Sequence, residues 1–341
     1  MHEIDKNFTK EELNSDASYF NHPNVSNSDL GLLKKDPWLF YLTKNKKIEK
    51  ASFDHFELGT LIHLAVLEPE KFAVADIDKP GGLMGVFLSH YIEAGMNDEA
   101  AKFAYKKSGF RQSLETIMNK LKDKDIAKYI AFMQTSTDKL VLTSSQKYVI
   151  DRAIDGVKRN PKAMEYLINK DKDKEYFNEL SLFGIVNCTN GDVKIKGKPD
   201  RIIIDHKAKT IRCIDLKSTS SGPYFEATKI NDSGDPRIDY IGTGFFGSFK
   251  GFEYYRQCAF YNQLIRQNFK ELALKYTISN HIVPVNTTES FSCSVINVTE
   301  KWTNAGYDEM MHILQAYNEH KKKNDWKVNF FYPTTKGEIV I

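Results

Sequence analysis

The sequence predicts an α/β (α+β) fold in which a helical N-terminal part is followed by a mixed β-sheet core flanked by helices. From residue 84 to residue 168, apolar side chains recur at spacings of three and four, the period of a helix with one buried face. From about Phe177 onward the pattern changes to short apolar runs separated by turn residues, which is typical of strands. Helices followed by alternating strands and helices indicate one sheet that helices cover.

The composition is that of a globular protein in a reducing compartment. With 341 residues and 41% hydrophobic residues, the chain can form one large domain or two modest ones. Its net charge of +3 is too small to indicate nucleic-acid binding by itself. The four cysteines include no Cys-x-x-Cys pair, which disfavours disulfides and zinc or iron–sulfur sites. No apolar run of about 18 residues and no leader peptide is present, so we expect a cytoplasmic protein without a membrane partner.

We expect a polar leader over residues 1–24, a helical part over residues 25–170 and a sheet core over residues 171–341, with residues 25–330 forming one integrated domain. The elements predicted within the core are a strand from Phe177 to Val186, a hairpin turn at Asn190-Gly191, a Gly-rich loop over residues 228–250, helices from Phe252 to Phe269 and from Trp302 to Lys322, and strands from Leu274 to Val285 and from Phe291 to Val298.

Capping and breaking residues divide the helical part. Ser26 or Ser28 is expected to cap a first helix, because a hydroxyl oxygen accepts a free N–H of the first turn. Asp36-Pro37 interrupts this helix, since proline lacks the N–H that a helix interior requires. A second helix is predicted from Phe53 to Leu67. The turn signals that end the helical part are Asp155-Gly156 and Asn160-Pro161.

A hairpin in the core brings two acids together. Its predicted strands run from Arg201 to Asp205 and from Thr210 to Asp215, around a four-residue polar turn. Asp205 then faces Thr210, and counting outward places Asp200 directly opposite Asp215. Opposed residues of an antiparallel pair have Cβ atoms roughly 4.5–5.5 Å apart.

Two carboxylates this close repel each other unless a cation lies between them. Lys217, two residues past Asp215, points to the same face of its strand. Oxygen ligands with open positions suit Mg²⁺ or Mn²⁺, which keep waters and bind phosphates. We interpret Asp200, Asp215 and Lys217 as a phosphodiesterase centre, with a structural ion pair as the alternative. The spacing Asp-x-Lys alone is a weak signal, since it recurs where solvated charge pairs are expected, at Asp192/Lys194, Asp205/Lys207 and Asp325/Lys327.

Other candidate residues each have a plainer structural interpretation. His63 lies in an apolar helix, where a histidine is often a core residue. Gln257 and Tyr261 are one turn apart and share a helix face, which an ordinary polar edge also shows. Glu179 is either a third acid or a surface residue. From Lys194 to Lys217, eight Lys or Arg and three Asp indicate either a local phosphate-binding surface or strand-edge lysines that discourage aggregation.

The order of these residues resembles a known family. The motifs are Gly59-Thr60-x-x-His63, Glu179, Gly197-x-x-Asp200, Asp215-x-Lys217 and Gln257-x-x-x-Tyr261. In this order they resemble the RecB-type branch of the PD-(D/E)XK nuclease superfamily, which implies a restriction-endonuclease-like fold. The front of the chain is most similar to the phage RecE-like exonuclease VIII group, through Ser26-x-Ser28-x-x-Gly31-Leu32-Leu33, Pro37-x-x-Phe40 and Leu67-Glu68-Pro69-Glu70-x-Phe72.

The resemblance implies a role for each candidate. Asp200, Asp215 and the main-chain carbonyl of Leu216 would ligate the metal, and Lys217 would position or activate the attacking water. His63 would lie beside the metal as a ligand or phosphate contact. Further implied roles are a second-metal ligand for Glu179, support of Lys217 by Gln257 and Tyr261, and DNA contacts for Lys198, Arg201, Ser218, Thr219 and Tyr261.

The implied activity is a Mg²⁺-dependent exodeoxyribonuclease, with Mn²⁺ as a substitute, that hydrolyses linear double-stranded DNA 5′ to 3′. The 3′ tails would serve phage or prophage recombination, with a RecT-like single-strand annealing protein as partner and a homo-oligomer in the bacterial host cytoplasm. No iron–sulfur cluster is expected. Two alternatives stay open: a RecB-type nuclease of another DNA repair or defence pathway, and a nuclease-fold module that binds DNA without cutting it.

Overall fold

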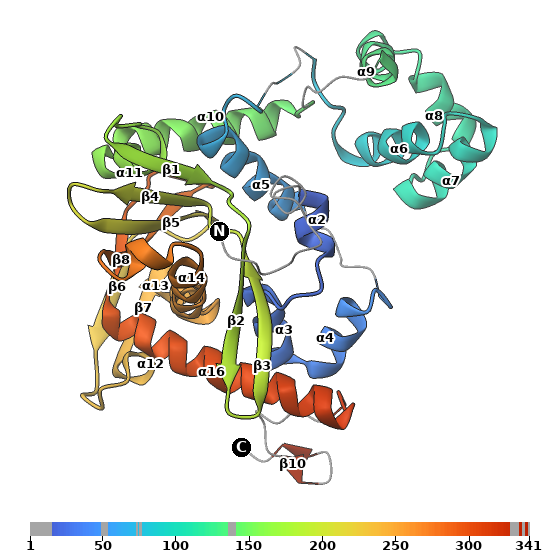
Figure 1. Ribbon diagram of the computed structural model, residues 1–341. Coiled ribbons are helices and arrows are strands. Elements are labelled where there is room, and N and C mark those ends of the chain that lie inside the picture. The colour runs from blue at the N-terminus through green and yellow to red at the C-terminus, as the bar shows by residue number, and fades with distance from the viewer. Residues whose placement is uncertain are drawn as a thin grey trace. The chain divides into compact units, whose positions relative to one another are not determined.

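The computed structural model describes residues 16–48, 54–72, 74, 77–135, 141–327, 334–335 and 338–339 (Figure 1). Two compact units divide the chain: residues 1–59 with 155–341 form the first, and residues 60–154 form the second. The predicted leader lies outside the described residues as far as residue 15, and Asp16–Asn21 then forms helix α2. Folding of residues 25–330 as one integrated domain stays a prediction.

The first unit is built on a five-stranded mixed sheet with the strand order β1-β4-β5-β8-β9 (Figure 1). Strands β5 and β8 run parallel, whereas the other neighbouring strands are antiparallel. A mixed sheet accompanied by helices confirms the predicted fold class. The strands span Lys174–Asn178 (β1), Arg201–Asp205 (β4), Thr210–Thr219 (β5), Thr277–Asn286 (β8) and Ile296–Val298 (β9).

The β4–β5 hairpin has the predicted register. Asp205 pairs with Thr210 and Arg201 pairs with Ile214, so the turn consists of residues 206–209. Isoleucines of both strands belong to the main apolar core, together with residues of helices α14 (Tyr254–Asn268) and α16 (Glu300–Lys323). Because both faces of β4 are buried, the four-residue turn fixes the register of this hairpin.

A second hairpin, β2–β3, lies outside the five-stranded sheet. Its strands span Leu182–Cys188 and Gly191–Gly197, and Cys188 pairs with Gly191 across the turn. This pairing confirms a hairpin at the predicted place, but the turn is one residue earlier than predicted: its two residues are Thr189 and Asn190, and Gly191 begins β3.

The prediction of a single strand from Phe177 to Val186 is wrong. The strand is interrupted at Glu179, which lies between β1 and β2. Glu179 has a φ of +47°, a left-handed conformation that ends a strand. Its N–H donates to the carbonyl oxygen of Asp200 at 3.0 Å, which stabilises this uncommon backbone conformation. The interruption between β1 and β2 therefore depends on a hydrogen bond to Asp200, which lies 21 residues further along the chain.

The Gly-rich stretch predicted as a loop over residues 228–250 is structured, which corrects that prediction. Phe246 and Phe249 pack against Trp302 of α16, with ring centroids 6.0 and 5.1 Å apart. These aromatic contacts form a second apolar cluster that orders the segment. Its elements are Phe225–Lys229 (β6), Pro236–Asp239 (α12), Tyr240–Gly244 (β7) and Phe245–Gly251 (α13), with β6 and β7 forming a hairpin.

Capping residues define the helices at the front of the chain. Ser26 accepts the Asp29 N–H and Asp29 accepts the Ser26 N–H, a capping box that begins α3. Asp36 caps α4, with Pro37 at the first helical position. The helix predicted from Phe53 to Leu67 is confirmed over its described residues. The three helices span Asn27–Lys35 (α3), Pro37–Lys44 (α4) and Asp54–Leu67 (α5).

The second unit is helical, as predicted. Phe87 and Leu88 pack with Ala104, Ile117 and Tyr129 in an apolar core of their own. Within the described part of the chain, every helix is too short or too polar to cross a bilayer. The helices that lie wholly in this unit are Gly82–Glu93 (α6), Asp98–Ser108 (α7), Leu114–Lys120 (α8) and Lys124–Thr135 (α9).

Helix α10 (Ser144–Arg159) continues through Asp155-Gly156, so the helix end predicted there is wrong. A Cβ at Gly156 would lie 1.9 Å from the carbonyl oxygen of Phe291, so this glycine allows close packing and does not end the helix. Asn160 does begin a new helix, α11 (Pro161–Leu167), by accepting two of its N–H groups. The remaining elements are α15 (Lys270–Ala273), β10 (Thr334–Thr335) and β11 (Glu338–Ile339).

Candidate active site

Two aspartates and a lysine meet at the open end of the β4–β5 hairpin. Oδ2 of Asp200 accepts the Leu216 N–H at 2.7 Å, and Nζ of Lys217 lies 2.6 Å from Oδ2 of Asp215. Asp200 and Asp215 are almost wholly buried, with exposed fractions of 7% and 4%. Burying two carboxylates is costly unless they are bonded or neutralised, so their placement requires a reason.

Without a metal, the electrostatics of the site disfavour ionisation of both acids at once. Burial raises the pKa of Asp200 to about 8, and the charge of Asp215 adds to the rise, against the opposing effects of Lys217 and the Leu216 N–H. Burial lowers the pKa of Lys217, but the carboxylates of Asp215 and Asp200 outweigh it, and the pKa lies above its ordinary value. Lys217 is therefore a cation. A further cation beside the acids would relieve their remaining repulsion.

Helix α14 supports the acids from the same unit. The side-chain amide of Gln257 donates to Oδ1 of Asp215 at 3.3 Å and to Oη of Tyr261 at 3.0 Å. The Tyr261 hydroxyl in turn donates to the carbonyl oxygen of Lys198 at 3.4 Å. The expected support of Lys217 thus acts through Asp215, and Tyr261, which is 8% exposed, contacts the protein main chain.

Tyr254 is a site residue that the sequence reasoning missed. Its ring centroid lies 5.1 Å from Nζ of Lys217, within cation–π range. The available signal was helical spacing, since Tyr254 precedes Gln257 by three residues and Tyr261 by seven on α14, which places all three on one face.

Glu179 contributes a third carboxylate. One of its oxygens lies within 4.8 Å of a carboxylate oxygen of Asp200. Another contact is an ion pair with Lys198, whose Nζ lies 2.8 Å from Oε2 of Glu179. The left-handed backbone of Glu179, held by the Asp200 carbonyl, places this acid beside the hairpin.

His63 lies on α5 in the second unit, one helical turn after Gly59, which belongs to the first unit. A Cβ at Gly59 would lie 3.0 Å from Oγ of Ser218, the residue after Lys217. Residues four apart share a helix face. A role for His63 beside the acids stays a prediction.

The residues expected to contact DNA include two that are buried, Arg201 and Tyr261. Arg201 is 1% exposed, and its guanidinium donates to the carbonyl oxygens of Leu167 and Asn169 at 2.7 and 3.2 Å. Arg201 therefore supports the fold, and the prediction that it contacts DNA is corrected. The candidates that are partly exposed are Lys198, Ser218 and Thr219.

The donor atoms at this site fit a hard divalent cation. Asp200 and Glu179 offer carboxylate oxygens that lie within 4.8 Å of each other. The carboxylate of Asp215, which contacts Lys217 and Gln257, and the main-chain carbonyl of Leu216 offer further oxygens on β5. Among the described residues, the cluster of possible metal ligands contains no cysteine. Oxygen-only donor sets of this kind suit Mg²⁺ or Mn²⁺.

A mixed sheet that presents clustered carboxylates and a lysine at the end of a hairpin defines a nuclease. Residues 24–323 match the family model described as the PD-(D/E)XK nuclease superfamily, so the chain belongs to this superfamily. Nucleases of the superfamily generally use divalent metal ions, in agreement with the oxygen donors at the site.

Nine solved chains are similar to this chain, and two of them serve as examples. One is a protein of Eubacterium rectale that is provisionally designated an exonuclease, with 14% identity, a TM-score of 0.48, and coverage of 93% of this chain and 87% of that one. The other is the protein SSO0001, with 14% identity, a TM-score of 0.22, and coverage of 72% of this chain and 95% of that one. Neither likeness is close enough to support a functional argument. No curated protein matches the chain.

Proposed function

We propose that this protein is a Mg²⁺-dependent exodeoxyribonuclease that degrades linear double-stranded DNA 5′ to 3′ and leaves 3′ single-stranded tails. The observation that carries the proposal is the convergence of Asp200, Asp215 and Lys217 in a chain of the nuclease superfamily. Hydrolysis of a phosphodiester needs negative charge to be stabilised on the attacking and leaving oxygens. Buried acids that can hold a metal, next to a buried lysine, suit that task.

The metal-binding residues in this proposal are those with oxygen donors at the hairpin. Asp200, Asp215 and the carbonyl of Leu216 would hold Mg²⁺, and Glu179 would provide a further carboxylate. His63 would add an imidazole from α5, a ligand that suits Mn²⁺ better than Mg²⁺. A bound divalent ion would supply the positive charge that stabilises the oxygens of the reacting phosphate.

Lys217 would orient the attacking water and stabilise charge on the phosphate. Its ammonium lies 2.6 Å from Asp215, and its burial makes its charge more effective than it would be in water. Gln257 would hold Asp215 through its amide, and Tyr261 would hold Gln257. The ring of Tyr254 would restrict the lysine further.

The finer biological assignment rests on the resemblance to RecE-like nucleases. The 3′ tails would be used in phage or prophage recombination by a RecT-like annealing protein in the bacterial host cytoplasm. A homo-oligomer would keep the enzyme on its substrate. Lys198, Ser218 and Thr219 would contact the DNA backbone, which would make binding salt-sensitive.

The test is digestion of matched DNA substrates by the full chain. Linear duplex labelled at the 5′ or the 3′ end is incubated with Mg²⁺, with Mn²⁺ or with EDTA, and covalently closed circular duplex of the same sequence is the control. We expect metal-dependent release of nucleotides from the 5′-ended strand and an intact circle. Cleavage of the circle at the same rate would make the protein an endonuclease, and no cleavage of any substrate would make it a binding module.

A further inference from the structure

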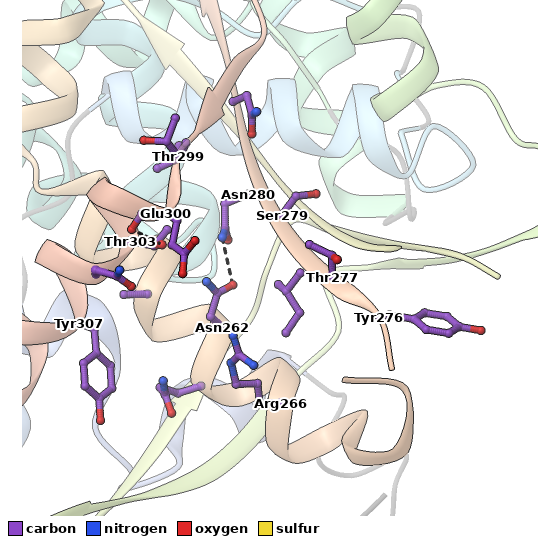
Figure 2. Close-up of a pocket in the computed structure, with 16 residues that line it drawn as sticks. Asn262, Arg266, Tyr276, Thr277, Ser279, Asn280, Thr299, Glu300, Thr303 and Tyr307 are labelled. Atoms are coloured by element: carbon purple, nitrogen blue, oxygen red, sulfur yellow. Dashed lines mark hydrogen bonds between the residues drawn. The ribbon is translucent and has the colours of Figure 1, made fainter. Parts of the chain in front are cut away.

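A polar cavity of about 440 Å³ lies between helices α14 and α16 and the first half of β8 (Figure 2). The cavity arises because β9 pairs with β8 only from Asn280 to Ile282, after which the chain turns into α16. Thr277 and Ser279 therefore line the cavity at a sheet edge that β9 does not cover. Its volume is in the range of small-molecule sites, roughly 300–1,000 Å³.

Asn280 is the buried polar group of this cavity. It is 3% exposed, and its amide nitrogen donates to Oδ1 of Asn262 on α14 at 3.1 Å (Figure 2). Its own Oδ1 is buried and has no hydrogen-bond donor among the residues that the structure describes. A buried acceptor without a donor costs free energy, so a ligand that brings an N–H or O–H to Asn280 would be favoured.

Two charges of opposite sign face the same cavity. Arg266 projects from α14 and Glu300 from the first turn of α16 (Figure 2). Neither forms an ion pair with any other residue between 141 and 327. Tyr307, two turns after Glu300 on the same face of α16, adds a ring that is 39% exposed.

We propose that this cavity binds a nucleoside monophosphate. Carboxamides pair with the edges of nucleobases, so the Asn280–Asn262 pair would bind the base, with Oδ1 of Asn280 accepting a base N–H. Arg266 would bind the phosphate, and Glu300 would accept a sugar hydroxyl or an exocyclic amine. Tyr307 offers a ring for stacking.

The cavity is separate from the acid cluster, although helix α14 contributes residues to both. Gln257 and Tyr261 on α14 contact the acid cluster, whereas Asn262 and Arg266 on the same helix line the cavity. The proposed ligand belongs to the class of compounds that a DNA exonuclease releases. Binding itself, however, requires neither the metal nor the proposed nuclease activity, so the two proposals can fail independently.

The test is calorimetric titration of the full chain with each of the four deoxynucleoside monophosphates and the matching deoxynucleosides, in buffer with EDTA. We expect saturable binding of at least one nucleotide, one per chain. Asn280→Ser should weaken it about tenfold, as loss of one buried hydrogen bond implies. Arg266→Gln, a change at an exposed side chain, should weaken nucleotide binding while leaving the nucleoside affinity unchanged.

Two controls make the result decisive. Asn318→Ser changes an asparagine of α16 that donates to Gly191 outside the cavity, and it should leave binding unchanged. Asp215→Asn should also leave binding unchanged, because the acids are not part of the cavity. The proposal is overturned if no nucleotide binds, if glycine or glutamate binds in its place, or if binding depends on Asp215 and not on Arg266.

Discussion

The main-chain N–H of Leu216 donates to Oδ2 of Asp200 at 2.7 Å. Because Leu216 lies between Asp215 and Lys217, this bond attaches Asp200 to the strand segment that carries the other two site residues. The carboxylate of Asp200 therefore lies beside Asp215 even though Asp200 precedes β4 and is not part of the strand ladder. The proximity of the acids follows from one hairpin and one hydrogen bond, and the charge of Asp215 adds to the rise in the pKa of Asp200 that burial causes.

Without metal, stability should fall as pH rises through the titration of Asp200. The pKa of this group is raised from 3.8 in the unfolded chain to about 8 in the fold, by burial and by the charge of Asp215. A raised pKa means that the folded state holds the proton of Asp200 more tightly than the unfolded chain does. The protonated side chain therefore contributes to the free energy of unfolding at low pH, and this contribution is lost as pH rises to about 8. We expect the unfolding free energy of the wild type, relative to Asp200→Asn, to decrease between about pH 5 and pH 8 in EDTA. If urea denaturation shows the same difference in unfolding free energy between the wild type and Asp200→Asn at every pH, the electrostatic account is contradicted.

Lys217→Ala should lose much more turnover than DNA affinity. A lysine that acts on the water and on developing charge works mainly in the transition state, while other basic residues still bind phosphates. Single-turnover cleavage and fluorescence anisotropy on the same duplex separate the two quantities. Lys207→Ala, in the exposed turn of the same hairpin, is the matched control and should change neither the cleavage rate nor the DNA affinity. A proportional loss of rate and affinity would make Lys217 a phosphate anchor.

His63→Ala should leave the melting temperature nearly unchanged and strongly reduce cleavage. As a core residue, His63 would instead leave a cavity, and stability would fall by about 2–4 kcal/mol. Loss of an imidazole ligand should also change the ratio of Mn²⁺- to Mg²⁺-supported cleavage, since imidazole favours Mn²⁺. His90→Ala on α6, in the same unit, is the control. If the variant is fully active and fully stable, His63 is not part of the active site.

Arg201→Met should lower stability without changing DNA affinity. The substitution leaves the carbonyl oxygens of Leu167 and Asn169 without their donor, which costs about 1–3 kcal/mol. Arg212→Met removes a partly exposed arginine of the same hairpin and should cost less. Urea denaturation measures the loss of stability, and fluorescence anisotropy measures the DNA affinity. Reduced affinity at unchanged stability would restore Arg201 as a DNA contact.

The hairpin could be predicted from sequence because its determinants are local. The four-residue turn fixes Asp205 against Thr210, and the apolar residues on both faces of β4 make it a central strand. Ser26 could likewise be identified as a cap from its own neighbours. Glu179 could not be placed, because its left-handed backbone is stabilised by the distant Asp200 carbonyl.

Long-range packing explains the other differences. Residues 228–250 have the composition of a loop, but Phe246 and Phe249 order them through Trp302, which lies far along the chain. Gly156 resembles a helix end in sequence, and only the approach of Phe291 shows why a glycine is needed within the helix. Arg201 was placed among DNA contacts by its charge, whereas its burial depends on the carbonyl groups after α11.

The central claim is that Asp200 and Asp215 form one metal-dependent cleavage centre. The most direct measurement is Mg²⁺-dependent degradation of linear duplex by Asp200→Asn and Asp215→Asn, with circular dichroism on the same preparations. Asp205→Asn, the aspartate at the turn of the same hairpin, is the matched control. The account predicts a loss of at least about 100-fold in both site variants, intact folds, and near-normal cleavage by the control. Near-normal cleavage by either site variant, or equal loss in the control, would contradict it.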